Sequence, residues 1–292
     1  MLRGHAVSED HPVIVEPVHR RIRVLFGGRV IADSVRARLL FELRYTPRYY
    51  LPVADVASDV LVPSATRTES WCKGESRWWD VRVGDRVAHD AAWAYPDPSP
   101  VGGPDLNGLV SFVWDAMDHW FEEEDEVFVH PKDPYSRLEI LESSRRVDVS
   151  VDGVALASSS RPRIAYEGTL FPRYYLPPLD VRRDLLVASP TTTACPYKGR
   201  AVYYGVRCPG GVRADLAWSY PAPTLEATRL AGYISFFQEH CDVVVDGEPV
   251  GHPESKWLYG GPNAYTYTPG DPTAKTGFND PPLYIPDQLS KD

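Results

Sequence analysis

The sequence predicts a mainly β protein built from two tandem copies of a small antiparallel domain, each with one helix. The first observation is an internal repeat, in which residues 21–98 align with residues 146–223 without a gap and 33 of 78 positions are identical. The second is the alternation of apolar and polar residues in short segments that end at Gly-containing turns. The third is a total of 28 prolines, which interrupt the chain too often for long helices.

The first repeat is predicted to span residues 21–128, after a lead-in of residues 1–20. It begins with a hairpin over residues 21–32, whose turn is Gly27-Gly28. Two further short strands are predicted, at residues 48–51 and 78–83.

The helix of the first repeat is predicted from apolar residues at helical spacing over residues 109–121. A shorter counterpart is predicted over residues 234–241 of the second repeat. The acidic run at residues 122–126 is expected to be a solvated helix end.

A linker with two prolines, residues 129–145, precedes the second repeat at residues 146–257. Asp152-Gly153 and Asp246-Gly247 predict hairpin turns within that repeat. Two more strands are predicted there, at residues 173–176 and 203–208. The remaining residues, 258–292, are rich in Tyr, Pro and Gly and are expected to form an extended arm over the second domain.

Long blocks recur in both repeats: R-Y-Y-L-P, a Lys-Gly pair, and W-x-Y-P-x-P. Together with T-x-C-P-Y-K-G in the second repeat, they resemble the domain-of-unknown-function 427 family in its double-domain bacterial form. The resemblance covers residues 20–257 and implies a compact, tent-like β fold. It implies little chemistry, because the family is named for lacking a known function.

A nucleotidyltransferase-like label is attached to that family, and the residues do not support it. Such enzymes hold divalent metal with closely spaced carboxylates after a Gly-Ser turn. Gly27-Gly28 has no paired carboxylates after it, and no phosphate-binding G-x-x-x-x-G-K-[ST] loop occurs. Metal-binding members of the tent-like fold use paired cysteine turns, which this sequence lacks. We therefore predict no metal and no cofactor.

Two lysines occupy matched positions, although only six of the 31 cationic residues are lysine. Lys73 and Lys198 each precede a glycine after a predicted bend. Either ammonium would bind a carboxylate or phosphate in a pocket, or act as a base if desolvated. In the structural alternative, Lys73 and Lys198 pair with Asp90 and Asp215 and hold the bend in place.

Cys195 is the candidate nucleophile, because a thiolate beside a cation has a lowered pKa. Only the second repeat keeps this cysteine, and Ser70 replaces it in the first. The alternative is a cysteine that packs as a small hydrophobe.

Aromatic and arginine residues at matched strand positions predict either a core or the walls of a ligand pocket. The candidate ligand-binding residues other than the lysines and aspartates are Trp93, Tyr95, Arg173, Tyr174, Tyr197, Tyr203, Trp218 and Tyr220.

The preferred function is binding of a small polar, anionic or aromatic molecule, with the second repeat favoured. Lys198 would hold the negative group of the ligand, Asp215 would orient that lysine, and Tyr203 and Trp218 would form walls. One alternative is an enzyme that uses Lys198 or Cys195 at the same pocket. Another is a module that binds a protein partner through its aromatic surfaces.

Composition excludes several classes of protein. A formal net charge of −9 argues against a nucleic-acid binder, which needs a basic face. No segment approaches the roughly 18 consecutive apolar residues of a membrane span, and residues 1–19 contain no apolar block of the signal-peptide type. Four irregularly spaced cysteines form no C-x-x-C pair. A soluble cytoplasmic protein is therefore expected.

Overall fold

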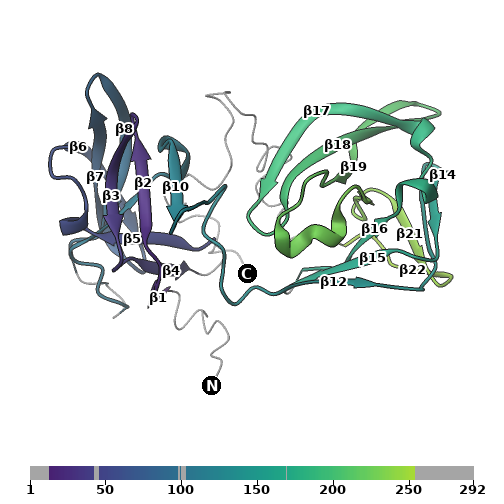
Figure 1. Ribbon diagram of the computed structural model, residues 1–292, viewed down its shortest axis with the longest axis horizontal. Helices are drawn as coiled ribbons and strands as arrows, with labels where there is room; N and C mark the ends of the chain where they lie inside the picture. The colour runs from purple at the N-terminus through teal and green to yellow at the C-terminus, as the bar shows by residue number, and fades with distance from the viewer. Residues whose placement is uncertain (1–12, 43–45, 98, 100–102, 169, 254–292) are drawn as a thin grey trace. The chain divides into compact units, whose positions relative to one another are not determined.

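The computed structural model describes residues 13–42, 46–97, 99, 103–168 and 170–253. These residues divide into unit 1, which ends at Asp133, and unit 2, which begins at Pro134 (Figure 1). Each unit consists of one seven-stranded and one four-stranded sheet, with the same strand order in both units. The predicted mainly β, duplicated architecture is therefore confirmed.

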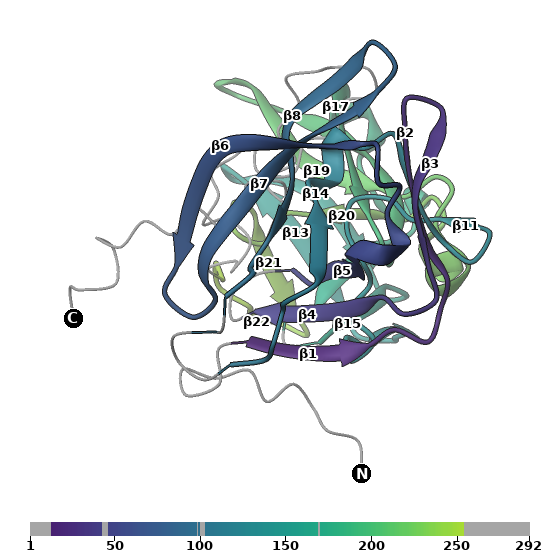
Figure 2. The same cartoon turned by 90° about the vertical axis from the view of Figure 1, so that its left-hand side faces the viewer.

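In unit 1, neighbouring strands are antiparallel, and β6, β7 and β8 run side by side in Figure 2. The seven-stranded sheet has the order β1 (Val13–Pro17), β4 (Arg38–Glu42), β5 (Arg48–Pro52), β9 (Leu109–Phe112), β8 (Arg86–Ala94), β7 (Gly74–Val83) and β6 (Leu61–Ser70). The four-stranded sheet has the order β11 (Asp125–Glu126), β10 (His119–Glu122), β2 (Ile22–Phe26) and β3 (Arg29–Ser34).

Unit 2 repeats this arrangement strand for strand. Its seven-stranded sheet has the order β12 (Leu138–Glu142), β15 (Arg163–Glu167), β16 (Arg173–Leu176), β20 (Ile234–Phe236), β19 (Gly211–Ser219), β18 (Gly199–Cys208) and β17 (Leu186–Cys195). Its four-stranded sheet has the order β14 (Val154–Ser159), β13 (Val147–Val151), β21 (Asp242–Val245) and β22 (Glu248–Pro249). β1 and β12 lie in the segments that the sequence predicts as lead-in and linker.

Successive side chains point to opposite faces of each seven-stranded sheet, as the period of a β-strand requires. In unit 1, Tyr49 and Ala92 pack with residues of the four-stranded sheet, such as Ile22. Their neighbours Tyr50 and Trp93 belong to a separate buried cluster. Each seven-stranded sheet therefore has an inner face, packed on the four-stranded sheet, and an outer face with its own cluster.

The predicted hairpins form where the turn dipeptides stand. β13 pairs with β14, and Asp152 and Gly153 between them both have a positive φ, at 49° and 76°. The Gly27-Gly28 turn joins β2 to β3 in the same way. Positive φ at both central residues is the geometry of the turns that match the twist of a hairpin.

The predicted helices are wrong. Residues 109–121 form β9, a short 3₁₀ turn at Trp114–Ala116 and part of β10, and residues 234–236 form β20. Val110, Ser111 and Phe112 are all buried, so β9 is covered on both faces. A run of apolar residues in two short buried strands separated by a turn mimics the spacing of an amphipathic helix. The longest helical segment among the described residues is a 3₁₀ helix at Leu225–Leu230.

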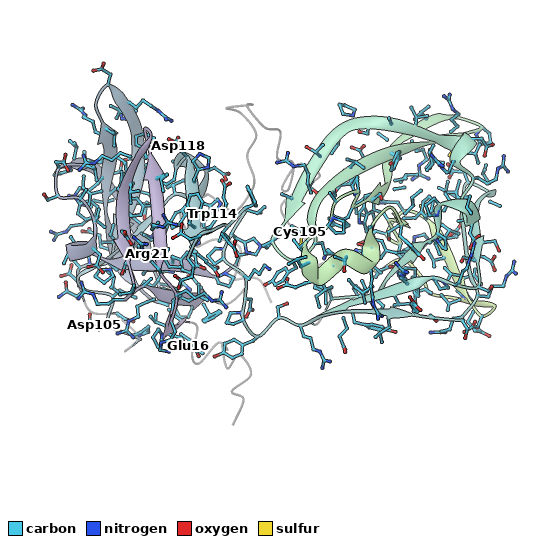
Figure 3. All side chains as sticks on the ribbon, viewed as in Figure 1. Glu16, Arg21, Asp105, Trp114, Asp118 and Cys195 are labelled. Carbon is cyan, nitrogen blue, oxygen red and sulfur yellow. The ribbon has the colours of Figure 1, made fainter. Side chains whose placement is uncertain are left out.

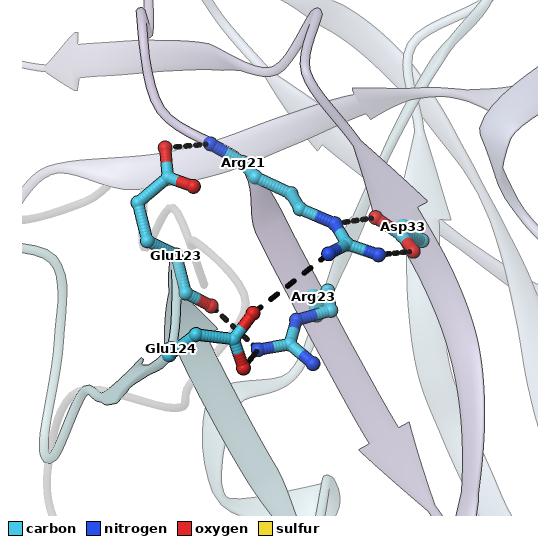
Figure 4. A network of polar contacts seen from close by, with 5 residues as sticks. All are labelled: Arg21, Arg23, Asp33, Glu123 and Glu124. Atoms are coloured by element: carbon cyan, nitrogen blue, oxygen red, sulfur yellow. Dashed lines mark hydrogen bonds and ion pairs between the residues drawn. The ribbon is translucent and has the colours of Figure 1, made fainter.

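The acidic run at residues 122–126 forms the β10–β11 hairpin instead of a helix end. Its carboxylates face Arg23 of β2 and Arg21, which directly precedes that strand (Figure 4). The backbone N–H of Arg21 donates to Glu123 over 2.9 Å, and the Arg23 guanidinium donates to Glu124 over 2.7 Å. Arg21 also binds Asp33 of β3. These exposed ion pairs stabilise the fold only modestly.

The arm predicted for residues 258–292 lies outside the described residues. Within the described part of the chain, no helix is long and apolar enough to cross a membrane.

Candidate functional site

The outer face of each seven-stranded sheet gathers most of the residues that the sequence predicts as a site. In unit 1, the outer cluster contains Trp93 of β8 and Tyr95, which directly follows that strand. Tyr50 and Trp78 belong to the same cluster. In unit 2, Trp218 and Tyr220 join Tyr175, with Cys195 and Tyr203 packed against them. The matched aromatic residues are therefore mainly buried.

Each of the two matched lysines forms an ion pair within its own unit, but with a glutamate and not with the predicted aspartate. Lys73 binds Glu42 at the end of β4, and Lys198 binds Glu167 at the end of β15. The Lys73 and Glu42 side chains are 2% and 11% exposed, and those of Lys198 and Glu167 are 12% and 17% exposed. Burial of such a charge requires a close partner, which the glutamate supplies.

The predicted partners Asp90 and Asp215 have a different role. Asp90 accepts hydrogen bonds from Ser64 and Thr66, and Asp215 accepts one from Thr191 over 2.8 Å. Both aspartates have a positive φ, at 48° and 53°. Each aspartate lies beside a register shift, which interrupts the β7–β8 pairing in unit 1 and the β18–β19 pairing in unit 2. The hydrogen bonds of the aspartates therefore hold the strands together where the regular pairing is interrupted. Asp215 therefore does not orient Lys198.

A second duplicated contact lies next to each Lys–Glu pair. The indole N–H of Trp93 donates to the Tyr50 hydroxyl over 3.0 Å, and that of Trp218 donates to the Tyr175 hydroxyl over 3.2 Å. Burial raises the pKa of Tyr175 to about 12, although Lys198 opposes the shift. Each phenol is therefore neutral at neutral pH.

Arg48 and Arg173 extend both clusters to the surface. Their guanidinium carbons lie 5.6 Å and 5.7 Å from the ring centres of Trp93 and Trp218. This is the geometry of a cation–π contact. Arg173 and Trp218, which are both predicted as ligand-binding residues, therefore lie next to each other.

Cys195 lies close to Lys198 but is poorly activated. Burial raises the pKa of its thiol, and the nearby ammonium of Lys198 only partly offsets that effect. Burial disfavours the charge of Lys198 as well, but the carboxylate of Glu167 opposes that effect, and the pKa of the lysine is raised. A protonated thiol is a weak nucleophile. Figure 3 shows Cys195 at the end of its strand in unit 2.

The remaining predicted residues of unit 2 lie in different places. Tyr203 binds Thr193 through its hydroxyl over 2.9 Å, so it closes one side of the outer cluster. Tyr197 stands in the turn before Lys198, and its carbonyl accepts a hydrogen bond from Thr224. Tyr174 packs on the inner face, away from Tyr175 and Trp218.

An open pocket lies in unit 1 beside Arg48, which is partly exposed, and Trp93, which is buried. It is shallow: its enclosed space is about 20 Å³, room for about one water molecule, and the rest of it is open to solvent. Its lining is mainly aromatic and apolar: Thr46, Pro47, Arg48, Tyr49, Trp93, Ser111, Phe112, Val113, Trp114, Trp120, Val129, His130 and Pro131.

Two of the pocket's tryptophans form a rigid wall. The rings of Trp114 and Trp120 are parallel to within 2°, with centres 4.4 Å apart. The Trp120 indole N–H donates to the Trp114 carbonyl over 3.2 Å, which fixes the pair. Trp114 remains partly exposed. His130 donates through Nδ1 to the Pro131 carbonyl over 2.6 Å, which fixes the orientation of its imidazole.

Sequence reasoning missed the glutamates, Tyr50 and Tyr175, and the pocket. Glu42 and Glu167 stand at the same 125-residue offset as the lysines, so the repeat alignment contained that signal. The pocket has no such signal, because Trp114 and Trp120 occur only in the first repeat and lie where the sequence predicts a helix.

The outer clusters and the pocket of unit 1 contain aromatic rings and paired charges, and no activated nucleophile stands among their described residues. Among the residues that the structure describes, no three His, Cys, Asp or Glu side chains cluster so as to hold a metal ion. The depression presents the partly exposed ring of Trp114 and the partly exposed guanidinium of Arg48 at its surface.

The fold and these contacts define a class: a duplicated antiparallel β domain whose copies each bury a Lys–Glu pair beside a Trp–Tyr pair. The chain belongs to the family of the domain of unknown function 427 (DUF427), whose sequence profile matches residues 14–123 and 139–247. The predicted resemblance is thereby confirmed. No curated protein matches the chain.

Proposed function

We propose that this protein binds a small polar, aromatic or anionic molecule in the tryptophan-lined pocket of unit 1. The observation that carries the proposal is the combination of the Trp114–Trp120 wall with Arg48 over Trp93 around one open depression. Ligand pockets are typically concave and apolar, with a few polar groups that orient the ligand.

The proposal moves the favoured site from the second repeat to the first. The positive charge of Lys198 is already balanced by Glu167 within a largely buried pair. An ammonium held in this way supports the fold. Its charge is neutralised by the glutamate, so it attracts an anionic ligand only weakly. The alternative is an enzyme that uses Cys195 as its nucleophile. The raised pKa of the Cys195 thiol argues against it.

The cytoplasm is the proposed place of action. Cys72, Cys195, Cys208 and Cys241 are all free thiols, which is usual for proteins in a reducing compartment.

A thermal-shift screen against a collection of metabolites tests the proposal. A true ligand raises the melting temperature of the wild-type protein, and at a hundredfold excess over Kd it stabilises the folded state by about 2.7 kcal/mol. The Trp114→Gln variant should lose this stabilisation, because glutamine offers no aromatic wall.

Trp71→Gln is the matched control. Trp71 lies in the same unit but is 44% exposed on the turn between β6 and β7, away from the pocket lining. This variant should keep the full response. An equal response in Trp114→Gln and wild type would place the ligand elsewhere, and no response to any compound would remove the proposal.

A further inference from the structure

Two cysteines of unit 2 lie on its two different sheets. Cys208 is the last residue of β18 in the seven-stranded sheet and is partly exposed. Cys241 directly precedes β21 of the four-stranded sheet and is 0% exposed. Both side chains belong to the inner cluster of unit 2, which lies between the two sheets. The other two cysteines, Cys72 and Cys195, belong to the outer clusters of unit 1 and unit 2.

Both Cys208 and Cys241 stand beside the turn at Asp152-Gly153, which joins β13 to β14. The thiol of Cys208 lies next to the carboxylate of Asp152. β21 pairs with β13 through Asp242 and Ser150, so Cys241 continues this register at the end of β13, directly before the turn. The two thiols therefore approach the same turn from opposite sheets.

The corresponding positions of unit 1 meet at its own turn, Gly27-Gly28. Val83 stands where unit 2 has Cys208, and a Cβ atom on Gly27 would lie 2.9 Å from the Cβ of Val83. Asp118 stands where unit 2 has Cys241, because it directly precedes β10, the strand that corresponds to β21. Its carboxylate accepts hydrogen bonds from both backbone N–H groups of the turn. Side chains at these two positions therefore come together at one turn.

Arg213 acts on both thiols of unit 2. Its guanidinium donates to the carboxylate of Asp152 over 3.1 Å. Burial raises the pKa of both thiols, that of Cys241 to about 12, and Arg213 opposes the shift in each. The charge of an ionised Cys208 also disfavours ionisation of Cys241. These effects agree with a cluster in which the two thiols are neighbours.

From this placement we infer that Cys208 and Cys241 form a modification site, which a low-molecular-weight disulfide such as glutathione disulfide oxidises to an intramolecular disulfide. The bridge would join the two sheets of unit 2. Unit 1 has Val83 and Asp118 at the two positions, so it gains no such bridge. The site is separate from the pocket of unit 1 and goes beyond the proposed ligand binding.

The reaction consists of two successive thiol–disulfide exchanges. The partly exposed Cys208 loses its proton and attacks one sulfur of glutathione disulfide, which forms a mixed disulfide and releases one glutathione thiolate. Cys241 then loses its proton and attacks the Sγ atom of Cys208, which releases the second glutathione thiolate. The two protons end on the two released thiolates. Two protein thiols and one disulfide therefore give one protein disulfide and two glutathione thiols.

Incubation of the full-length protein with glutathione disulfide at a series of pH values tests the inference. The number of thiols titrated after denaturation should fall from four to two, and a peptide map without reduction should show Cys208 linked to Cys241. Because burial keeps both thiols protonated, formation should be slow and should accelerate about tenfold for each unit of pH. Four free thiols after prolonged exposure, or a linkage between any other pair, would overturn the inference.

Substitutions of single cysteines separate the two steps. Cys241→Ser should stop at the mixed disulfide between glutathione and Cys208. Cys195→Ser is the matched control in the same unit, and it should form the bridge at the rate of the wild type. If Cys241→Ser fails to fold, Cys208→Ser replaces it, because Cys208 is partly exposed and its substitution disturbs the core less. Cys208→Ser should form no disulfide within the chain, and a bridge in either variant would contradict the assigned pair.

Discussion

Lys73 is buried and Lys198 is largely buried, and each forms its ion pair within one unit. Lys73 and Lys198 enter the outer clusters with their charge balanced by Glu42 and Glu167. A buried pair of this kind adds little net stability over an apolar pair, but removal of one partner leaves an uncompensated charge. Each Lys–Glu pair therefore holds the bend that carries its lysine in place. Its net contribution to the free energy of unfolding is small.

Glu167→Gln should lower the free energy of unfolding by about 3–5 kcal/mol, because the Lys198 ammonium would then be buried without a counter-charge. Urea unfolding measures the change. Glu139→Gln is the control in the same unit, since it removes one partner of the exposed Arg137–Glu139 pair and should cost less than about 1 kcal/mol. Similar losses in both variants would contradict a structural role for the Lys198–Glu167 pair.

At the scale of elements, the hairpins follow the local sequence closely. The dipeptides at the turns determine the register of β2–β3 and β13–β14, because few residues tolerate a positive φ. The strands on either side then alternate between the inner and outer faces. β9 and β20 do not alternate in the sequence, because both of their faces are buried, and the sequence therefore predicted helices there.

Gly153→Ala should lower the free energy of unfolding by about 1–2 kcal/mol. Its φ of 76° lies in the left-handed region, where a Cβ atom is strained even though no atom stands within 4 Å of it. Denaturant unfolding gives the difference.

Gly210→Ala is the matched control for this turn. Gly210 also has open space around its Cβ position and shows no left-handed φ. Its substitution should change stability by less than about 0.5 kcal/mol. Equal destabilisation by both variants would mean that the left-handed φ is not what requires glycine at position 153.

At the scale of the whole molecule, the duplication produces two domains that each bury their own core. No sheet contains strands from both units among the described residues, and each unit has an inner and an outer cluster of its own. A domain with its own core and complete sheets is expected to fold independently.

We therefore expect fragments 1–133 and 134–292 each to unfold in one cooperative transition. Near-ultraviolet circular dichroism and calorimetry measure this, and the many buried aromatic residues give each fragment a strong signal. A fragment with strand content but no fixed aromatic environment would show that its core depends on the other half of the chain.

Sequence by itself determined the duplication, the β class and the hairpin turns, because these depend on local periodicity and on backbone angles that few residues tolerate. It also picked out the matched lysines, Trp93, Trp218 and Arg173. Only the tertiary structure decided that the lysines pair with Glu42 and Glu167, since those partners lie 31 residues away in the chain. It alone also decided where the pocket lies, because the pocket forms from segments that are separate in the sequence and meet at one end of a sheet.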